Sequence, residues 1–243
     1  MEDMLSPRKN NIKNFLYGLK QRISKNPRPA LNDIDKKLSR YINYRNGFFI
    51  EAGANDGYAQ SNTYYLEKKL GWRGVLVEAI PELYQKCLRE RPNSRVYNCG
   101  LVSRSYGEPA LTMHYANLMS VAQGGLKTEE AQEEHIKNGL KIQNLDRTYQ
   151  IEVPARTLGS ILDEQDDLPD IDLFSLDVEG FELEVLKGLN IEKYRPRYIL
   201  VEARFFDEVN GFLKDRYDLV DRFSAHDCLY RSKTAGDNVP AAL

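Results

Sequence analysis

The chain has 243 residues, of which 42% are hydrophobic and 10% aromatic, so it can bury a core, and disordered or collagen-like classes are excluded. Its 34 basic and 36 acidic residues give a net charge of −2, without the basic excess typical of a nucleic-acid-binding protein. Three widely spaced cysteines form no disulfide or zinc pattern, and no apolar run reaches the roughly 18 residues of a membrane span. We therefore expect a cytoplasmic protein with one large domain.

The first 47 residues contain eleven basic and four acidic side chains, a net charge of +7 that leaves −9 for the remainder. Apolar residues recur at helical spacing from Ile12 to Ile23 and again from Leu31 to Ile42, with two prolines between the segments. This pattern predicts a basic N-terminal extension of two amphipathic helices over residues 1–46. The helices either pack on the main domain or offer a surface for an anionic partner or a homo-oligomer.

From residue 47 onward, short apolar runs alternate with segments of helical character. Ser61 is a candidate N-cap for the first helix, and Pro81 suits the first turn of the second. Such alternation predicts buried parallel strands joined by crossover helices, and hence a doubly wound α/β fold. The expected strands cover residues 48–51, 74–78, 95–102, 173–177 and 198–202, and a further helix covers 181–189.

The end of the chain departs from that alternation, because two strand-like runs, 217–223 and 228–231, are separated by only four residues. A connection this short suits a hairpin better than a crossover, which predicts an antiparallel pair at the edge of the sheet. The main domain is therefore expected to span residues 47–243.

A long excursion, residues 104–153, separates the third and fourth expected strands. It contains an expected short strand at 111–115 and a polar, helix-like stretch at 128–138. This length exceeds an ordinary connection in a compact domain, and long loops at the active edge of such sheets tend to form lids or substrate walls. We expect an insertion that covers the substrate, although a charged helix is also typical of a solvated surface.

Four of the expected strands end in a carboxylate. Parallel strands open their carboxyl ends onto one ligand crevice, so these side chains should converge there. Charged groups in such a place need a polar ligand, a metal ion or water to offset their loss of solvation. This repeated ending is the strongest functional signal in the sequence, and it is carried by Glu51, Glu78, Asp177 and Glu202.

The turn after the first strand, from Glu51 to Gly57, contains two glycines. Gly53 permits a tight turn, and Gly57 would let the backbone approach a ligand. The spacing is GxxxG and not the GxGxxG of dinucleotide-binding proteins, which argues against a pyrophosphate. Glu78 follows Gly57 by 21 residues and ends the next strand, where an acidic side chain binds ribose hydroxyls. Together these features indicate an adenosine-type ligand.

Several motifs follow one another in a defined order: FFIEAGANDG at 48–57, GWRGVLVE at 71–78, SLDVEGFE at 175–182, ILVE at 199–202 and DCLYR at 227–231. In this order they resemble the FkbM-type methyltransferases, over about residues 47–232. The sequence departs from that family at Ala79-Ile80-Pro81, where a proline often follows the glutamate directly, but the ribose-binding residue itself is present.

The resemblance implies a class I methyltransferase fold, which is a Rossmann-like, mostly parallel sheet of seven strands with an antiparallel last strand. It also implies S-adenosylmethionine as cofactor and O-methylation of a sugar or other small hydroxylated acceptor. By position, the first turn would surround the methionine moiety, Glu78 would bind the ribose, and 98–101 would lie near the adenine. The implied cofactor-binding residues are Glu51, Gly53, Ala54, Asn55, Asp56, Gly57, Ser61, Asn62, Glu78, Ala79, Asn98, Gly100, Leu101 and Asp177.

Methyl transfer requires the acceptor oxygen to face the sulfonium in line, and it requires a base that removes the hydroxyl proton. Asp177 ranks first as that base, because it closes the fourth strand beside the expected position of the sulfonium. Each histidine among the other candidates also suits an ordinary structural or solvent-exposed role. These other candidates are Glu179, Glu202 and His226 in the main domain, and His114 and His135 in the excursion.

Asp177 and Glu202 could instead hold a divalent cation, since oxygen ligands suit Mg²⁺, Ca²⁺ or Mn²⁺ and a metal lowers the pKa of a bound hydroxyl. Two other functions remain open at this level. A nucleotide-dependent oxidoreductase would use the same crevice, but the missing third glycine and the terminal hairpin argue against it. A non-catalytic nucleotide- or S-adenosylmethionine-binding module would use the N-terminal helices as a docking surface.

Overall fold

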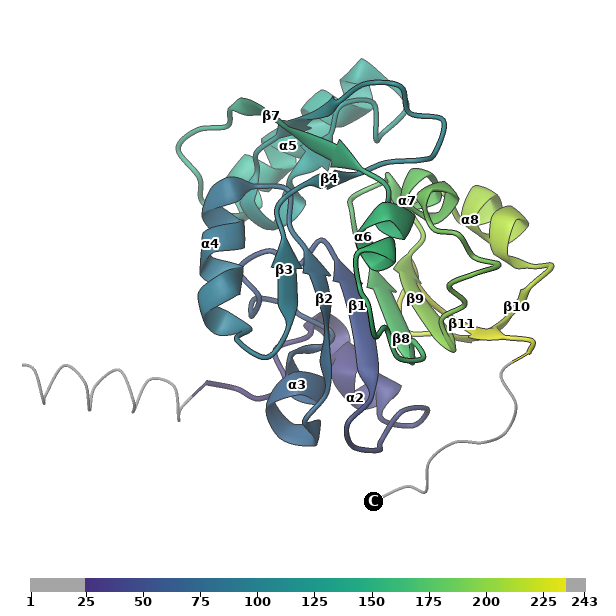
Figure 1. Cartoon of the computed structure of the whole chain (residues 1–243). Coiled ribbons are helices and arrows are strands. Elements are labelled where there is room, and N and C mark those ends of the chain that lie inside the picture. The colour runs from purple at the N-terminus through teal and green to yellow at the C-terminus, as the bar shows by residue number, and fades with distance from the viewer. Residues whose placement is uncertain (1–24, 235–243) are drawn as a thin grey trace, which may run out of the picture.

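A sheet of seven strands crosses the centre of the molecule (Figure 1). The computed structural model describes residues 25–234, so the helix expected over 12–23 lies outside the described residues. The strand order in the sheet is β10-β11-β9-β8-β1-β2-β3. Their bounds are β1 (Phe48–Ala52), β2 (Arg73–Val77), β3 (Arg95–Tyr97), β8 (Leu173–Leu176), β9 (Tyr198–Glu202), β10 (Tyr217–Arg222) and β11 (Asp227–Ser232).

The strands from β9 through β3 are parallel, whereas β11 runs antiparallel to both of its neighbours, β9 and β10. β1 pairs with both β2 and β8 and is buried along its whole length. Its near-continuous apolar run is typical of a strand that is covered on both faces of the sheet. The expected doubly wound sheet, mostly parallel and with an antiparallel last strand, is confirmed, and β10 and β11 are the expected hairpin.

Helices cover both faces of the sheet. Successive residues of a strand point to opposite faces, so the apolar side chains of a buried strand need a helix layer on each side. Phe49 packs in one apolar cluster with residues of α2, α3 and α4, and Ile50 packs in another with residues of α6, α7 and α8. A short 3₁₀ turn, η1 (Leu31–Asp33), precedes α2. These helices are α2 (Ile34–Leu38), α3 (Tyr64–Leu70), α4 (Pro81–Glu90), α6 (Leu158–Asp163), α7 (Glu182–Gly188) and α8 (Phe206–Leu213).

The expected helix starts are largely found. Pro81 is the first residue of α4, where its missing N–H costs no hydrogen bond. α3 begins at Tyr64 and its N-cap residue is Thr63, so the N-cap predicted at Ser61 is wrong by two residues, although Ser61 Oγ accepts the Tyr64 N–H at 3.1 Å. The helix expected over 181–189 is α7. The sequence patterns did not indicate α6 or α8.

The strand expected over 95–102 is wrong in its second half. β3 ends at Tyr97, and the chain then enters β4 (Gly100–Leu101), which pairs with a strand of a second sheet. Asn98 lies at the break, and its side-chain amide donates hydrogen bonds of 2.8 and 2.9 Å to the carbonyl oxygens of Glu78 and Ala79. The carbonyl groups just after β2 therefore bond to a side chain and not to a further residue of β3. The chain turns away from β2 at this point.

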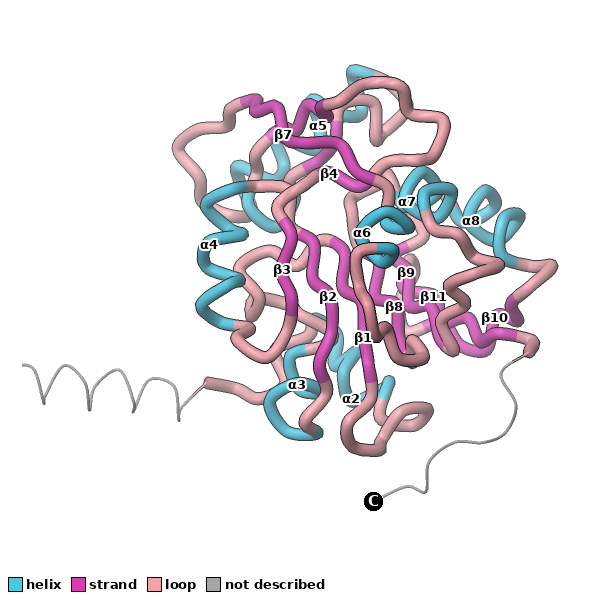
Figure 2. The backbone as a smooth tube through the Cα atoms, viewed as in Figure 1, coloured by secondary structure: helices cyan, strands magenta, loops and turns pink. Residues whose placement is uncertain are grey.

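The excursion forms a second sheet of four strands, in the order β4-β7-β5-β6. In Figure 1 it lies beyond the carboxyl ends of β1, β2 and β3, and Figure 2 shows its strands separated from those of the main sheet. The strand expected at 111–115 is β5, and the helix expected at 128–138 is α5, whereas β6 and β7 were not anticipated. The elements are β5 (Ala110–His114), the 3₁₀ turn η2 (Asn117–Met119), β6 (Val121–Ala122), α5 (Glu129–Ile142) and β7 (Gln150–Arg156).

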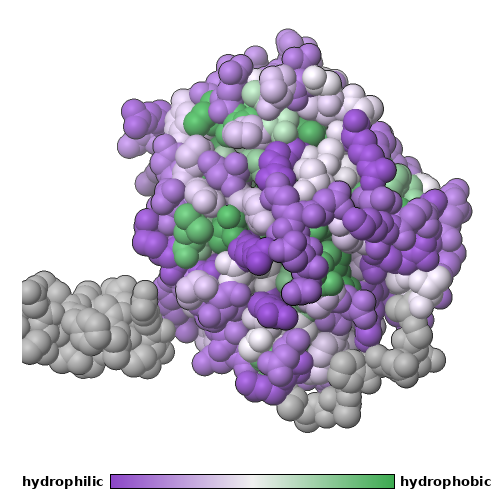
Figure 3. Space-filling model, in the orientation of Figure 1, coloured by the Kyte–Doolittle hydropathy of each residue, from purple (hydrophilic) through white to green (hydrophobic). Residues whose placement is uncertain are grey.

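The described part of the predicted N-terminal extension shares its core with the main sheet. Ile34, Leu38 and Ile42 are buried in the same apolar cluster as Phe49 of β1. Hydrophilic residues dominate the face of the molecule shown in Figure 3. Among residues 25–234, no helix is both long enough and apolar enough to cross a membrane.

Candidate active site

A cavity of about 320 Å³ lies between the carboxyl ends of the sheet strands and the excursion. This volume is at the lower end of the range for small-molecule sites, roughly 300–1,000 Å³. The four strand-end carboxylates, Glu51, Glu78, Asp177 and Glu202, all line it. The convergence that the strand endings predict is therefore present, as the crevice rule for parallel sheets requires.

Glu51, at the end of β1, is held by the protein itself. Its carboxylate accepts hydrogen bonds from Ser61 Oγ at 3.0 Å and Thr63 Oγ1 at 2.5 Å. Arg91 is fully buried, and its guanidinium lies 3.3 Å from Glu51 Oε2 and 2.8 Å from Glu67 Oε2. Because a buried charge needs a partner, this network commits most of the Glu51 carboxylate to structure and leaves only its cavity-facing side for a ligand.

The turn after β1 packs closely against the backbone at the end of β8. Gly53 has φ +82°, and a Cβ at this position would stand 1.8 Å from the carbonyl oxygen of Asp177. Only glycine permits this approach. Two residues later, Asn55 has φ +48°, and its backbone N–H donates to Glu78 Oε2 at 2.7 Å. The turn therefore ties the ends of β1, β2 and β8 together.

Glu78, at the end of β2, presents a carboxylate that backbone groups hold in place. Asn55 N–H and Ile80 N–H donate to its two oxygens at 2.7 and 2.8 Å. Burial raises the pKa of Glu78 to about 7, although these two hydrogen bonds oppose the shift. A fixed carboxylate that lines a cavity is suited to accept hydrogen bonds from two vicinal hydroxyls.

The remaining predicted cofactor residues divide into two groups. Ala54, Asn55, Ser61, Asn62, Ala79, Gly100 and Leu101 line the cavity with the residues already described. Asp56 lies outside the lining, and its carboxylate accepts the N–H groups of Tyr58 and Ala59. Gly57 faces Arg91, whose side chain would stand 2.8 Å from an added Cβ, so its missing side chain makes room for Arg91 and not for a ligand. Asn98 also lies outside the lining.

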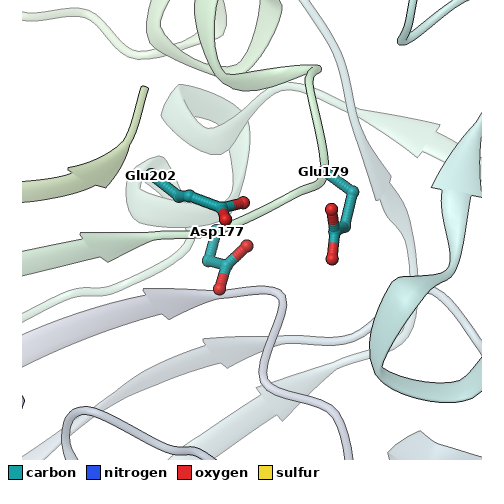
Figure 4. Close-up of side chains that lie close together, drawn as sticks. All are labelled: Asp177, Glu179 and Glu202. Atoms are coloured by element: carbon teal, nitrogen blue, oxygen red, sulfur yellow. The ribbon is translucent and has the colours of Figure 1, made fainter. Parts of the chain in front are cut away.

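Three carboxylates gather at the ends of β8 and β9 (Figure 4). One oxygen of each of Asp177, Glu179 and Glu202 lies within 4.8 Å of the others. The pKa of Asp177 is raised well above its ordinary value, first because the surrounding protein weakens the solvation of its carboxylate and then because of the charges of Glu202 and Glu179. Burial, followed by the charge of Glu202, raises the pKa of Glu179 to about 8. A carboxylate with a raised pKa is a stronger base than an exposed one.

Glu182 positions the loop that carries two of these carboxylates. It is buried at the start of α7, and its Oε1 accepts the N–H groups of Gly180 at 2.8 Å and Val178 at 3.3 Å. Within that loop, Glu179 has φ +57°, a conformation that costs a non-glycine residue energy and persists only where the surroundings enforce it. Burial raises the pKa of Glu182 to about 7.

Arg204, which the sequence patterns did not single out, contacts two of the three carboxylates. Its Nη2 donates to Glu179 Oε2, and its Nε lies 3.5 Å from Glu202 Oε2. Neither Arg204 Nε nor Glu202 Oε2 has a hydrogen-bond partner within the described residues, so their contact is an ion pair only. The signal available in the sequence was the position of Arg204, two residues beyond the end of β9.

The excursion reaches the same cluster through His135 of α5. His135 Nε2 lies 3.0 Å from the Met119 carbonyl oxygen, which can only accept, so this nitrogen carries the proton. The same atom lies 3.7 Å from Glu179 Oε2. Burial, followed by the charge of Arg204, lowers the pKa of His135, which favours its neutral form.

The other two candidate histidines do not line the main cavity. His226 is exposed in the turn between β10 and β11 and lines a separate, shallower hollow together with His135 and Arg204. His114 lies on β5, where its Nε2 is bonded to the side chains of Gln123 and Gln132. Neither residue is therefore in position to act on a molecule within the main cavity.

Two segments that the sequence did not connect form the cavity mouth. Leu31 and Ile34 line it from the N-terminal side, where Ala30 forms a bridge with Gln60 of the turn after β1. Leu118, Met119 and Ile142 line it from the excursion. Asn117 links the excursion to the turn after β1, because its Oδ1 accepts a hydrogen bond of 3.5 Å from the Asn55 amide, and within the excursion it donates to Gln143 at 3.2 Å. These long-range contacts have no local sequence signal.

Comparison with known proteins matches this chain to the methyltransferase FkbM domain, over residues 51–232. No protein with a curated description matches it.

Three solved structures with a similar chain trace illustrate the range of the match. Methyltransferase FkbM from Methylobacillus flagellatus KT is 17% identical, with a TM-score of 0.47 over 79% of this chain and 45% of that one. TrmK from M. capricolum, solved with S-adenosyl-homocysteine, is 8% identical, with a TM-score of 0.41 over 84% and 70%. Aeropyrum pernix fibrillarin, solved with S-adenosyl-L-methionine, is 13% identical, with a TM-score of 0.39 over 78% and 67%. The present chain thus spans less than half of the Methylobacillus protein.

Proposed function

Since the chain belongs to the FkbM methyltransferase family, we propose that it transfers a methyl group from S-adenosylmethionine to a hydroxyl oxygen of a sugar or another small acceptor. The observation that carries this proposal is the joint lining of one cavity by Glu78, a fixed carboxylate, and Asp177, a carboxylate with a raised pKa. The first suits a ribose, and the second suits removal of a hydroxyl proton.

The residues around the cavity fit S-adenosylmethionine. Glu78 would accept hydrogen bonds from the ribose hydroxyls, and the turn from Gly53 to Asn55 would border the methionine moiety. Cys99, Gly100 and Leu101 line the cavity next to Glu78 and offer an apolar surface to the adenine. When bound, the cofactor supplies an activated methyl group on a cationic sulfur.

The chain's own part in the reaction is to position the acceptor and to take its proton. Asp177 lies at the end of β8, beside the turn that contains Gly53. A hydroxyl that enters the cavity would give its proton to the Asp177 carboxylate as its oxygen forms the bond to the methyl carbon. The bond between that carbon and the sulfur would break at the same time, with its electron pair remaining on the sulfur of the demethylated product. The carboxylate of Glu202 also lines this part of the cavity, and a negative charge there would favour a cationic methyl donor.

The direct test is calorimetry of the full chain with S-adenosylmethionine and with its demethylated product. We expect both to bind, and a lack of binding of either one contradicts the proposal. A panel of hydroxylated acceptors, assayed by release of the demethylated cofactor, then identifies the substrate. An assay of reduced-nicotinamide absorbance tests the alternative of a nucleotide-dependent oxidoreductase, which would change this absorbance during turnover.

A further inference from the structure

The three carboxylates at the ends of β8 and β9 require a positive charge beside them. Asp177, Glu179 and Glu202 lie so close together that their oxygens fall within 4.8 Å of one another. Like charges at this separation repel one another unless a cation compensates them, and water screens the repulsion less at Glu179 and Glu202, whose side chains are only 12% and 22% exposed. Two kinds of cation could do so, a bound divalent metal ion or a basic side chain of the protein.

A basic side chain is already present at the cluster. Arg204 donates through Nη2 to Glu179 Oε2, and its Nε lies 3.5 Å from Glu202 Oε2. The guanidinium thus bridges carboxylates that come from two different segments, the loop after β8 and the end of β9. A planar guanidinium with several donors is better suited to such a bridge than an ammonium group.

Arg204 lies at the cavity in which we propose that methyl transfer takes place. Its side chain is 29% exposed, and it lines both the main cavity and the shallower hollow that contains His135 and His226. Two of the three carboxylates that could contribute a ligand to a metal ion, Glu179 and Glu202, are thus already in contact with a cation. The donor set therefore does not offer a metal three unengaged carboxylates.

We propose that the Arg204 guanidinium serves as the cation of this cluster and holds Glu179 and Glu202 in place around Asp177, so that methyl transfer requires no divalent metal. Arg204 is in this sense a positioning residue, since it acts through the carboxylates that it contacts. The inference deepens the proposed function and rests on it. It also assigns a role to Glu179, which has a strained φ of +57° and whose carboxylate accepts a hydrogen bond from Arg204.

The test compares the wild-type chain with Arg204→Met, which removes the charge at similar length, and Arg204→Lys, which retains it. Calorimetry with MnCl₂ alone provides a readout that requires neither cofactor nor acceptor. We expect no Mn²⁺ binding to the wild-type chain, binding to Arg204→Met, where the carboxylates lose their cation, and none to Arg204→Lys. Mn²⁺ binding to the wild-type chain as tight as that to Arg204→Met would overturn the proposal.

Turnover provides the second readout. Treatment with EDTA should leave wild-type turnover unchanged, and Arg204→Met should lose about 100-fold in kcat, as expected when reacting groups are displaced by about an ångström. The Kd for S-adenosylmethionine should change less than threefold, and Arg204→Lys should recover part of kcat. Arg231→Met, an exposed arginine on β11, is the matched control.

Loss of wild-type turnover in EDTA, restored by Mg²⁺ or Mn²⁺, would also overturn the proposal. This measurement needs no variant, so it decides the question even where Arg204→Met fails to fold. Failure of the proposed function is recognised separately, because it would abolish binding of S-adenosylmethionine, whereas Mn²⁺ calorimetry does not depend on the cofactor.

Discussion

The two sides of the cavity use the same kind of residue in opposite ways. At the ends of β1 and β2, Glu51 and Glu78 accept hydrogen bonds from hydroxyl, guanidinium and backbone N–H groups of the chain. At the ends of β8 and β9, Asp177, Glu179 and Glu202 lie close to one another, and Arg204 contacts Glu179 and Glu202. The first side is fixed by hydrogen bonds within the chain, and the second is the side on which we propose the base. The position at a strand end is therefore shared, whereas the role is set by the partners.

The strongest test of this contrast is Asp177→Asn. It should lower turnover by about 10²- to 10⁴-fold, the usual contribution of a general base, while the Kd for S-adenosylmethionine stays within a few-fold. Asp166→Asn, in an exposed loop, is the matched control. Unchanged turnover of Asp177→Asn would remove this residue as the base.

On the side of the cavity at the ends of β1 and β2, Arg91→Met should lower the stability of the fold more than the activity. The substitution leaves Glu51 and Glu67 as buried charges without their cation, so the free energy of unfolding should fall by about 3–5 kcal/mol. Urea unfolding of the two chains measures this difference in the free energy of unfolding. A loss below about 1 kcal/mol would show that this network is not what holds the cofactor side together.

Glu78→Gln should weaken cofactor binding more than it affects folding. A hydrogen bond to a charged group contributes about 1.5–3 kcal/mol, so the Kd for S-adenosylmethionine should rise by about 10- to 100-fold. Glu82→Gln, an exposed glutamate in the first turn of α4, is the control. Equal affinities of the two variants for the cofactor would assign the ribose contact to another residue.

The pH dependence of stability reports on the buried carboxylates. Glu78 and Glu182 have pKa values of about 7 and Glu179 of about 8, above the ordinary 4.5, so the folded chain holds protons that the unfolded chain releases. Their stabilising contribution is complete below pH 4.5 and is lost as the pH rises to about 8. The Tm of the cofactor-free chain should fall from pH 5 to pH 8.5. Glu182→Gln should flatten this slope, and a rising Tm would contradict the assignment.

The smallest effect is expected at the cavity mouth. Leu31 lines the mouth and is 53% exposed, so Leu31→Ala should change stability by no more than about 0.5 kcal/mol. We expect a higher KM for the acceptor with an unchanged Kd for S-adenosylmethionine. Leu219→Ala on β10 is the control, since Leu219 is also exposed but lies outside the cavity lining. Equal KM values for the two variants would place the acceptor away from the N-terminal segment.

Features that depend on neighbours in the chain could be predicted. The buried runs ending in Glu51 and Asp177 marked parallel strands, the four-residue spacing before Cys228 marked the hairpin, and Pro81 marked the start of α4. The break after Tyr97 could not be predicted, because it depends on a bond from Asn98 to carbonyl groups twenty residues earlier. The second sheet was missed for the same reason, since β4 pairs with β7 across the excursion.

The sequence by itself determined the fold class and the convergence of four carboxylates, because periodicity and strand endings are local properties that a parallel sheet converts into one shared edge. Only the tertiary structure decided what each carboxylate does. Glu51 meets Arg91 across 40 residues of chain, and Glu179 meets Arg204 across 25. Burial and partner charge set the protonation and freedom of a carboxylate, and both arise from contacts that no local pattern encodes.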